Sequence, residues 1–532
     1  MDLEQALRLA AAQLADEVPT ERLSHEARLG VLRSIAPDTG RDDIYQQMLQ
    51  WVVERLPDGA IAVRRDKGAH RATGAYYTQH AVVRYMVRRT HALLPDAARL
   101  VDPACGAGAF LAGAREFFGP QVHLVGFDTD NAAIELCRSL VPTAAIHQAD
   151  ALLDNGLPAG FDVCIGNPPY ISSGLRGAAQ QDPLRVAALK QRYPLTAQYK
   201  LNTYPLFVER GLNFLRDGGV LAFVLPDSFL SGQYFEGMRR LLLGNTVVEL
   251  TLVQEDFWEH GKVGQSTILL VKKGPAPAGH TVAVKVCRKV AELETTDPVP
   301  TSLSDLVWGP LKRFRLIPSP TTLAIVRAME EAAGARRLGD ELITYSGLIA
   351  RRGQSSFLRT TLPELAGPWG RLLRSGKEID RYRLTWAGEE VCLDPELIKS
   401  GGCLRYYQEP KLLLRQTADA LRAVYDGQGY YCLNNIHLLV PRCPETDLWA
   451  MLGLINSRAV SRYYQAMAME SGRLYAQVDL DLLESLPMPP RSPEQTARLH
   501  HLARKRQSAT PAEAALLDIA IDALVERLYA LP

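Results

Sequence analysis

The sequence predicts an α/β protein with a doubly wound mixed sheet, an N-terminal helical extension and a C-terminal α+β domain. The chain has 532 residues, and at roughly 150 residues per domain this length suggests two to four domains. Between residues 75 and 273, short apolar runs alternate with amphipathic segments, which is typical of a largely parallel sheet. Beyond the Pro- and Gly-containing segment 275–279 this alternation fades, and aromatic residues interleave with Arg and Lys.

Composition excludes several classes of protein. Lys and Arg number 60 and Asp and Glu 59, so the net charge of +1 excludes histone-like binding to polyanions, and any nucleic-acid surface must be local. No apolar stretch approaches the roughly 18 residues of a membrane span. The first helix carries acidic residues, unlike a signal peptide. We therefore expect a cytoplasmic protein with no membrane partner. The eight cysteines are dispersed without a CxxC pair, so neither a metal site nor a disulfide framework is expected.

Hydrophobic spacing places the elements in order. Apolar side chains at helical spacing through 3–14 and 44–56 predict that the extension is helical. The expected strands are Leu100–Asp102, His123–Asp128, Ala144–His147, Asp162–Gly166, Val220–Leu225, Val247–Val253 and Thr267–Val271. The expected helices are Ala81–Leu94, Ala109–Phe118, Asn131–Leu140 and Thr203–Leu215. A short connection between the last two strands predicts an antiparallel edge of the sheet.

These patterns divide the chain into five regions. They are a helical extension at 1–70, the sheet domain at 71–275, a linker at 276–340, the C-terminal domain at 341–492 and a helical segment at 493–532. Within the last region, periodicity predicts a helix over 511–531.

A glycine-containing turn follows the first strand of the sheet. It starts at Asp102, contains Gly106 and Gly108, and leads into a helix. Glycines let the backbone approach a ligand closely, but the third glycine of a dinucleotide loop is replaced here by Leu111. The acid that precedes the turn, Asp102, is suited to a cationic ammonium group.

Two further acids end the next two strands. Asp128 is placed to accept hydrogen bonds from ribose hydroxyls, and Asp150 to accept one from the exocyclic amine of an adenine. Each acid alone could be a helix N-cap. Together with Asp102 they match a ligand that combines an amino acid, a ribose and an adenine, so the sequence predicts S-adenosylmethionine as the cofactor.

The most specific motif is Asn167-Pro168-Pro169-Tyr170, at the end of the fourth strand. The two prolines fix φ and remove two backbone donors, which leaves an acceptor-rich site beside the Asn167 amide oxygen. A planar NH₂ group can donate to Asn167 and to the carbonyl of Pro168. Tyr170 offers a ring on which a planar substrate stacks.

With these motifs the sequence resembles the TaqI-like, or gamma-class, N6-adenine DNA methyltransferases, over residues 70–275 and more loosely over 340–490. The resemblance implies a class I methyltransferase fold, double-stranded DNA as the partner and a C-terminal target-recognition domain. It implies cofactor contacts at Thr78, Asp102, Pro103, Ala104, Cys105, Gly106, Asp128, Asp150, Pro169 and Phe207. It also implies that Asn167, Pro168 and Tyr170 are catalytic, and that Tyr170, Phe257 and Lys262 form the target-base pocket. Trp258 follows Phe257 where many relatives have proline.

The implied reaction is direct transfer. An adenine leaves the duplex at a cost of about a few kcal/mol and lies between Tyr170 and Phe257, with its amine on Asn167 and Pro168. The amine then takes the methyl group without a covalent nucleophile or a metal, so Cys105 is expected only to pack. In the C-terminal domain, segments 372–379, 411–415, 454–457 and 486–490 resemble target-recognition regions. Their Arg and Lys would divide between phosphate and base contacts.

Three alternatives remain at this point. A cytosine-N4 DNA methyltransferase shares the chemistry but more often has Ser in place of Asn167. A protein-glutamine N5-methyltransferase shares the motif but lacks a large C-terminal domain. A non-enzymatic DNA-recognition subunit would not need all three acids. A role in restriction–modification or phage defence would make a cognate restriction or defence-system protein a candidate partner.

Overall fold

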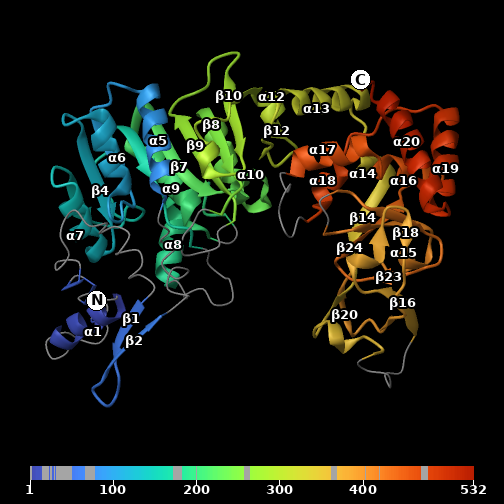
Figure 1. The fold of residues 1–532 in the computed structure, drawn as a ribbon, viewed down its shortest axis with the longest axis horizontal. Coiled ribbons are helices and arrows are strands. Elements are labelled where there is room, and N and C mark those ends of the chain that lie inside the picture. Colours follow the sequence, from blue (N-terminus) through green and yellow to red (C-terminus); the bar gives the residue numbers. More distant parts are fainter. Residues whose placement is uncertain are drawn as a thin grey trace. The chain divides into compact units, whose positions relative to one another are not determined.

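The computed structural model describes residues 3–14, 23, 27, 28, 30, 31, 51–65, 78–171, 182–198, 201–256, 264–360, 368–401, 403–417, 420–468 and 477–531. The chain divides into two compact units, Met1–Leu316 and Ile317–Pro532 (Figure 1). Within the described residues, no helix is long and apolar enough to cross a membrane.

A nine-stranded mixed sheet forms the centre of the first unit. Its strands lie in the order β5-β4-β3-β6-β7-β9-β8-β10-β11. Their bounds are β3 Arg99–Asp102, β4 His123–Asp128, β5 Ala145–Gln148, β6 Phe161–Gly166, β7 Leu215–Pro226, β8 Thr246–Val253, β9 Ser266–Lys272, β10 Thr281–Cys287 and β11 Val299–Ser302. The strands from β5 to β7 pair in parallel. β9 is antiparallel to both β7 and β8, which confirms the predicted antiparallel pairing, but these strands do not form the edge of the sheet, because β10 and β11 lie beyond β8.

Helices cover both faces of this sheet, as the burial of successive side chains along its central strands requires. On one face, Val163 and Ile165 share a core with α5 (His80–Leu93), α6 (Ala109–Phe118) and α7 (Asn131–Leu140). On the other face lies α9 (Thr203–Phe214), whose Gly211 has no room for a Cβ, because that atom would lie 2.6 Å from Leu221 Cδ1. Two further helices of this unit are α8 (Pro183–Arg192) and α11 (Glu236–Leu243).

The sheet continues past the predicted boundary at residue 275. β10 pairs with β8 and β11 pairs with β10, so both strands extend the same sheet. Residues 276–316 therefore belong to the first compact unit, although the sequence predicts a linker there. The rest of that predicted linker contains α13 (Pro320–Ala333) in the second unit.

The N-terminal extension is only partly helical. Helix α1 (Leu3–Leu14) is present, but the helix predicted through residues 44–56 is wrong at 51–55, where β1 (Trp51–Arg55) pairs with β2 (Ile61–Arg65) as an antiparallel hairpin. Consecutive β-branched residues favour a strand here. The turn between the strands contains Pro57-Asp58-Gly59, with Gly59 at a φ of +85°.

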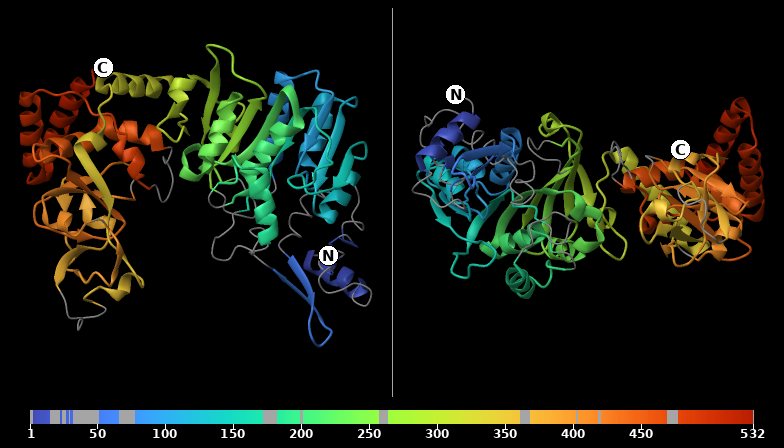
Figure 2. Two further views of the ribbon diagram at one scale, coloured as in Figure 1. Left: turned by 180° about the vertical axis from the view of Figure 1, so that it is seen from behind. Right: turned by 90° about the horizontal axis from the view of Figure 1, so that it is seen from below.

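This extension shares a core with the glycine-containing turn. Helix α1 lies beside the hairpin in the views of Figures 1 and 2. The side chains of Leu7 and Val53 belong to one buried cluster with Ala107 of the turn and with Ala132 of α7.

The second unit has an α+β fold. Its main sheets are four-stranded β14-β24-β21-β22 and three-stranded β19-β16-β23. The strands are β14 Leu342–Ser346, β16 Trp369–Leu373, β19 Glu390–Cys392, β21 Lys411–Arg415, β22 Ala423–Asp426, β23 Tyr431–Cys432 and β24 Ile436–Pro441. The longer helices after them are α16 Leu448–Ile455, α17 Arg458–Ala468, α19 Pro493–Gln507 and α20 Pro511–Leu528. The last of these confirms the helix predicted over 511–531.

Candidate functional site

The topology of the sheet brings two sequence motifs to one place. β3 is the first strand of the sheet; β4 and β5 follow it on one side, and β6 and β7 lie on the other. A ligand crevice forms at such a switch point, outside the carboxyl ends of the strands. Asp102 ends β3, Gly166 ends β6, and Asn167 follows β6 directly. A Cβ added to Gly166 would lie 2.5 Å from Asp102 Oδ1, so the two strand ends are in direct contact.

Asp102 is a buried carboxyl group with few partners. It is 1% exposed, and its Oδ1 accepts a hydrogen bond from the Ala104 N–H at 3.0 Å. No basic side chain forms an ion pair with it among the described residues. Burial, with a smaller contribution from the nearby Asp128 carboxylate, raises the pKa of Asp102 to about 8, although the Ala104 hydrogen bond opposes the shift.

Asp128 is a half-buried acid that connects the glycine-containing turn to the end of β4. Its Oδ2 accepts a hydrogen bond from the Gly106 N–H at 2.8 Å and its Oδ1 one from the Asp130 N–H at 2.9 Å. Burial raises the pKa of Asp128, while these hydrogen bonds oppose the shift. Gly106 has a φ of +50°, in the left-handed region that favours glycine.

Cys105 lies beneath this turn as a packed thiol. Its N–H donates to the Phe127 carbonyl at 2.9 Å, and its side chain is buried. Hydrogen bonding with the Cys137 thiol and burial both raise the pKa of Cys105, which opposes formation of a thiolate. Pro103 is also buried, and Ala104 is half-buried.

The other residues expected at the cofactor have defined places. Asp150 follows β5; it forms an ion pair with Arg185 of α8 and accepts a hydrogen bond from the Leu152 N–H at 3.0 Å. Phe207 is buried on α9, and Thr78 is buried just before α5. The two residues expected to complete the target-base pocket, Phe257 and Lys262, lie outside the described residues.

The Asn167-Pro168-Pro169-Tyr170 motif follows β6 directly. The Tyr170 hydroxyl lies 2.5 Å from Asn167 Oδ1 and 2.9 Å from the Val224 carbonyl oxygen. An amide oxygen has two lone pairs, so Asn167 can accept a second hydrogen bond. The Tyr170 ring also makes an edge contact with Tyr204, with 6.0 Å between centroids.

Thr203, the first residue of α9, clamps the same motif. Its Oγ1 donates to the Pro169 carbonyl and accepts from the Ile171 N–H at 2.9 Å, while its own N–H donates to the Ile171 carbonyl at 3.0 Å. The peptide groups on both sides of Tyr170 are therefore fixed by one buried side chain. The sequence did not assign this role to Thr203, because no spacing rule connects residues that lie over 30 positions apart.

Arg185 was missed for a similar reason. It lies on a helix that the sequence analysis did not predict, and only the fold places it beside Asp150. A cap signal was available for that helix: Asp182 precedes Pro183, and its carboxylate accepts a hydrogen bond from the Leu184 N–H at 2.9 Å.

The carboxyl groups at the switch point fit the predicted cofactor. The buried Asp102 carboxyl, which has no cationic partner among the described residues, suits an ammonium group, and the half-buried Asp128 carboxyl at the end of the next strand suits hydroxyl groups. Sheet order and site together define a class I S-adenosylmethionine-dependent methyltransferase fold.

Comparison with known proteins gives two family matches. Residues 123–256 match the Eco57I restriction-modification methylase family, and residues 372–488 match the TaqI-like C-terminal specificity domain. The resemblance inferred from the sequence is thereby confirmed for both segments. The class I fold and the methylase match imply S-adenosylmethionine as the cofactor.

Two similar curated proteins are named as a methyltransferase and a modification methylase. The chain is 33% identical to the Type II methyltransferase M.TthHB8I of Thermus thermophilus over 208 residues. This aligned region covers 38% of this chain and 46% of that protein. It is 23% identical to the modification methylase CviBIII of Paramecium bursaria Chlorella virus NC1A, over 36% of this chain and 47% of that protein. The chain thus spans about half the length of these relatives.

Two solved structures share the fold at low sequence identity. The Type IIL restriction-modification enzyme MmeI, solved in complex with DNA, has a TM-score of 0.59 at 13% identity and covers 88% of this chain and 77% of its own. The DrdV–DNA complex has a TM-score of 0.54 at 12% identity, over 95% of this chain and 66% of its own.

Proposed function

We propose that this chain is a restriction–modification DNA methyltransferase that transfers a methyl group from S-adenosylmethionine to the N6 amine of an adenine flipped out of double-stranded DNA. The observation that carries the proposal is the position of Asn167-Pro168-Pro169-Tyr170 at the carboxyl end of β6, in contact with the strand end that carries Asp102. The match to a restriction-modification methylase family and the two similar structures solved in complex with DNA support DNA as the substrate.

The residues of the chain divide the work between cofactor and target base. Asp102 would hold the ammonium group of the cofactor, Asp128 its ribose, and Asp150 with Phe207 its adenine. When bound, S-adenosylmethionine supplies an electrophilic methyl group. Asn167 Oδ1 and the Pro168 carbonyl would accept hydrogen bonds from the target amine, which orients its nitrogen lone pair. Catalysis then consists mainly of positioning and electrostatic complementarity.

Tyr170 has two roles in this proposal. Its hydroxyl hydrogen-bonds to Asn167 and so orients the amide plane, and its ring would stack on the flipped base. Phe257 and Lys262 would complete the pocket around the base. Base stacking in such a pocket offsets part of the cost of unstacking, which is about a few kcal/mol.

The proposal is tested by product identification. Incubating the full chain with duplex DNA and isotope-labelled S-adenosylmethionine, followed by digestion and mass spectrometry of the nucleosides, should yield labelled N6-methyladenine. Labelled N4-methylcytosine, or methylated protein in place of DNA, would contradict it. Single-molecule sequencing of DNA from cells that express the chain would give the sequence context.

A variant tests the site itself. Asn167→Ala removes the side-chain acceptor, so transfer should be abolished while the dissociation constant for DNA stays within about twofold of the wild-type value. Retained transfer activity in this variant would refute the assignment of Asn167.

A further inference from the structure

The loop that follows β5 is held by side chains from two helices. We call residues 150–154 the β5 loop; it begins with the acid expected at the adenine of the cofactor. Arg210 of α9 donates to the carbonyls of residues 151 and 154, at 2.8 and 3.1 Å. Arg192, the last residue of α8, donates to the carbonyl of residue 153 at 2.6 Å, and the Tyr193 hydroxyl donates to that of residue 152 at 2.7 Å. These hydrogen bonds fix the loop backbone and therefore the place of Asp150.

Arg185 of α8 sets the orientation of the Asp150 carboxylate within this loop. Asp150 Oδ1 accepts a hydrogen bond from the Leu152 N–H at 3.0 Å, and Oδ2 accepts one from Arg185 Nη1, with which it forms an ion pair. Each carboxylate oxygen has two lone pairs, so a ligand can still donate to either oxygen. The Asp150 side chain is 20% exposed and that of Arg185 39%, so both remain accessible to a ligand.

The charge environment of Asp150 differs from that of the other two acids at strand ends. Among the described residues neither Asp102 nor Asp128 has a cationic partner, whereas Asp150 has Arg185. An ammonium group needs a carboxylate whose charge is not already compensated. A neutral adenine amine needs only an oriented acceptor, and a carboxylate that is already paired is less costly to bury against an uncharged ring. The position of Arg185 therefore matches the neutral end of the cofactor.

We propose that Arg185 is a positioning residue for the adenine of the cofactor, because it holds the Asp150 carboxylate in the orientation that accepts a hydrogen bond from the adenine amine. This inference rests on the role given to Asp150 in the proposed function. The gain in affinity comes from pre-organisation, since a carboxylate that is already oriented loses no rotamer freedom when the ligand binds.

The test compares two ligands by calorimetry on the full chain without DNA. One is S-adenosylhomocysteine, the product that remains after methyl transfer, and the other is its analogue with hydrogen in place of the adenine 6-amine. We call the ratio of their dissociation constants the amine discrimination. In the wild-type chain this ratio should be about tenfold, as expected for one hydrogen bond to a charged group. In Arg185→Met, S-adenosylhomocysteine should lose about fivefold in affinity and the analogue less than about twofold, so that the ratio falls to about two.

Two further variants separate orientation of the carboxylate from stability of the loop. Arg185→Lys keeps the positive charge and a donor, so the amine discrimination should recover to about fivefold. Arg192→Met removes hydrogen bonds to the same loop without touching the Asp150 carboxylate, so it should weaken both ligands equally. Thermal unfolding curves verify that each variant is folded.

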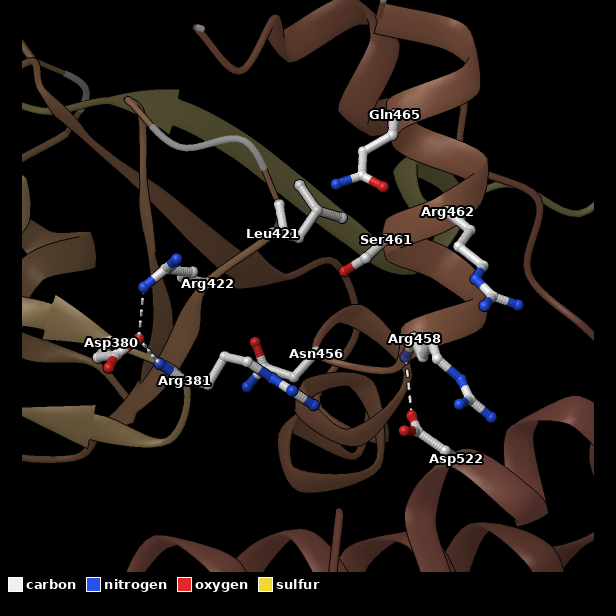
Figure 3. A pocket seen from close by; sticks show the side chains of 11 residues that line it. Asp380, Arg381, Leu421, Arg422, Asn456, Arg458, Ser461, Arg462, Gln465 and Asp522 are labelled. Atoms are coloured by element: carbon white, nitrogen blue, oxygen red, sulfur yellow. Dashed lines mark hydrogen bonds and ion pairs between the residues drawn. The ribbon is translucent and has the colours of Figure 1, made fainter. Parts of the chain in front are cut away.

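A matched control comes from the second unit. Arg422 lines a pocket of about 470 Å³ together with three other arginines, and it pairs with Asp380 at 3.1 Å, as Figure 3 shows. The Arg422 side chain is 36% exposed, close to the value for Arg185, and it lies in a different compact unit from the β5 loop. Arg422→Met removes a comparable ion pair, and it should bind both ligands within about twofold of the wild-type affinities.

Four results would overturn the proposal. The first is an equal loss for both ligands in Arg185→Met, and the second is a loss of amine discrimination in Arg192→Met as large as that in Arg185→Met. The third is tighter binding of S-adenosylhomocysteine by Arg185→Met, which would mean that Arg185 competes with adenine for Asp150. The fourth is a wild-type chain that binds both ligands equally.

Failure of this inference is distinguishable from failure of the proposed function. Amine discrimination that depends on Arg185, in a chain that does not methylate DNA, would refute the proposed function and leave this inference standing. Methylation of adenine in DNA by a chain without amine discrimination would do the reverse.

Discussion

Thr203→Val tests whether the clamp on the Asn167-Pro168-Pro169-Tyr170 motif sets the rate of methyl transfer. Valine has nearly the shape of threonine, so the substitution removes the hydroxyl without opening a cavity. Two hydrogen bonds disappear, the one to the Pro169 carbonyl and the one from the Ile171 N–H. The third, from the Thr203 N–H to the Ile171 carbonyl, is a backbone bond and remains.

The expected loss follows from these contacts. Each hydrogen bond contributes about 1 kcal/mol net, and a buried group left unpaired costs about 1–3 kcal/mol. Both partners of the lost hydroxyl are only partly buried, so water compensates some of this cost. We therefore expect the substitution to destabilise the aligned conformation of the loop by about 2 kcal/mol. At roughly 1.4 kcal/mol per tenfold change, the single-turnover rate should fall about 30-fold. The dissociation constants for DNA and cofactor should hardly change, because the carboxyl groups of Asp102 and Asp128 are untouched.

Two controls separate alignment from stability. Thr203→Ser keeps the hydroxyl and should restore most of the rate. Thr196→Val removes another buried hydroxyl of the same unit, which donates to Glu209 Oε2 at 2.7 Å away from the motif. It should lower stability by about 1–2 kcal/mol and leave the rate unchanged. A wild-type rate for Thr203→Val, or equal rate losses for the two valine variants, would refute the reasoning.

Three further outcomes follow from the site and the core. Because the pKa of folded Asp102 is about 8, above its unfolded value of about 3.9, its ionisation should lower stability as pH rises from about 4 to 8. Binding a cationic cofactor at pH 7 should then release about one proton. Calorimetry in buffers of different ionisation enthalpy measures this release, which should vanish in Asp102→Asn; no release from the wild-type chain would contradict the assignment. Gly166→Ala should weaken cofactor binding at least tenfold by fluorescence titration, since the new Cβ would lie 2.5 Å from Asp102 Oδ1; unchanged affinity would count against contact at this strand end. Lys411→Met should lower the free energy of unfolding, measured in urea, by about 3 kcal/mol. The substitution removes the cationic partner of the buried Asp426 carboxylate, which then accepts hydrogen bonds only from the N–H groups of residues 428–430. A loss below about 1 kcal/mol would contradict this.

Sequence reasoning was accurate where a local pattern and the final environment agree. The predicted strands of the sheet lie within a few residues of the observed ones, apart from an earlier start of β7, because each strand is apolar and bounded by turn residues. The predicted helices α6 and α7 have the observed bounds for the same reason. Short motifs at strand ends were equally visible, since glycine, proline and aspartate have specific backbone roles there.

Sequence reasoning failed where contacts between segments distant in the chain decide the structure. Residues 51–56 satisfy a helical spacing, but a strand partner and a Pro-Asp-Gly turn decide the outcome. The sheet extends through β10 and β11 because β10 pairs with β8 and β11 pairs with β10. The composition of these two strands does not differ from that of a linker. Many short strands of the second unit give no periodic signal, so its architecture could not be derived from spacing.

The sequence by itself determined the class of sheet, the glycine-containing turn, the three acids and the motif that contains Asn167, because each depends on local backbone chemistry. Only the tertiary structure decided which groups meet: Gly166 against Asp102, Thr203 around Tyr170, Arg185 on Asp150 and the arginines of the pocket. The physical reason is that hydrogen bonds and ion pairs act over a few ångströms. The partners in these contacts lie tens of residues apart in the chain, and the pairing of strands and the packing of helices bring them within that distance.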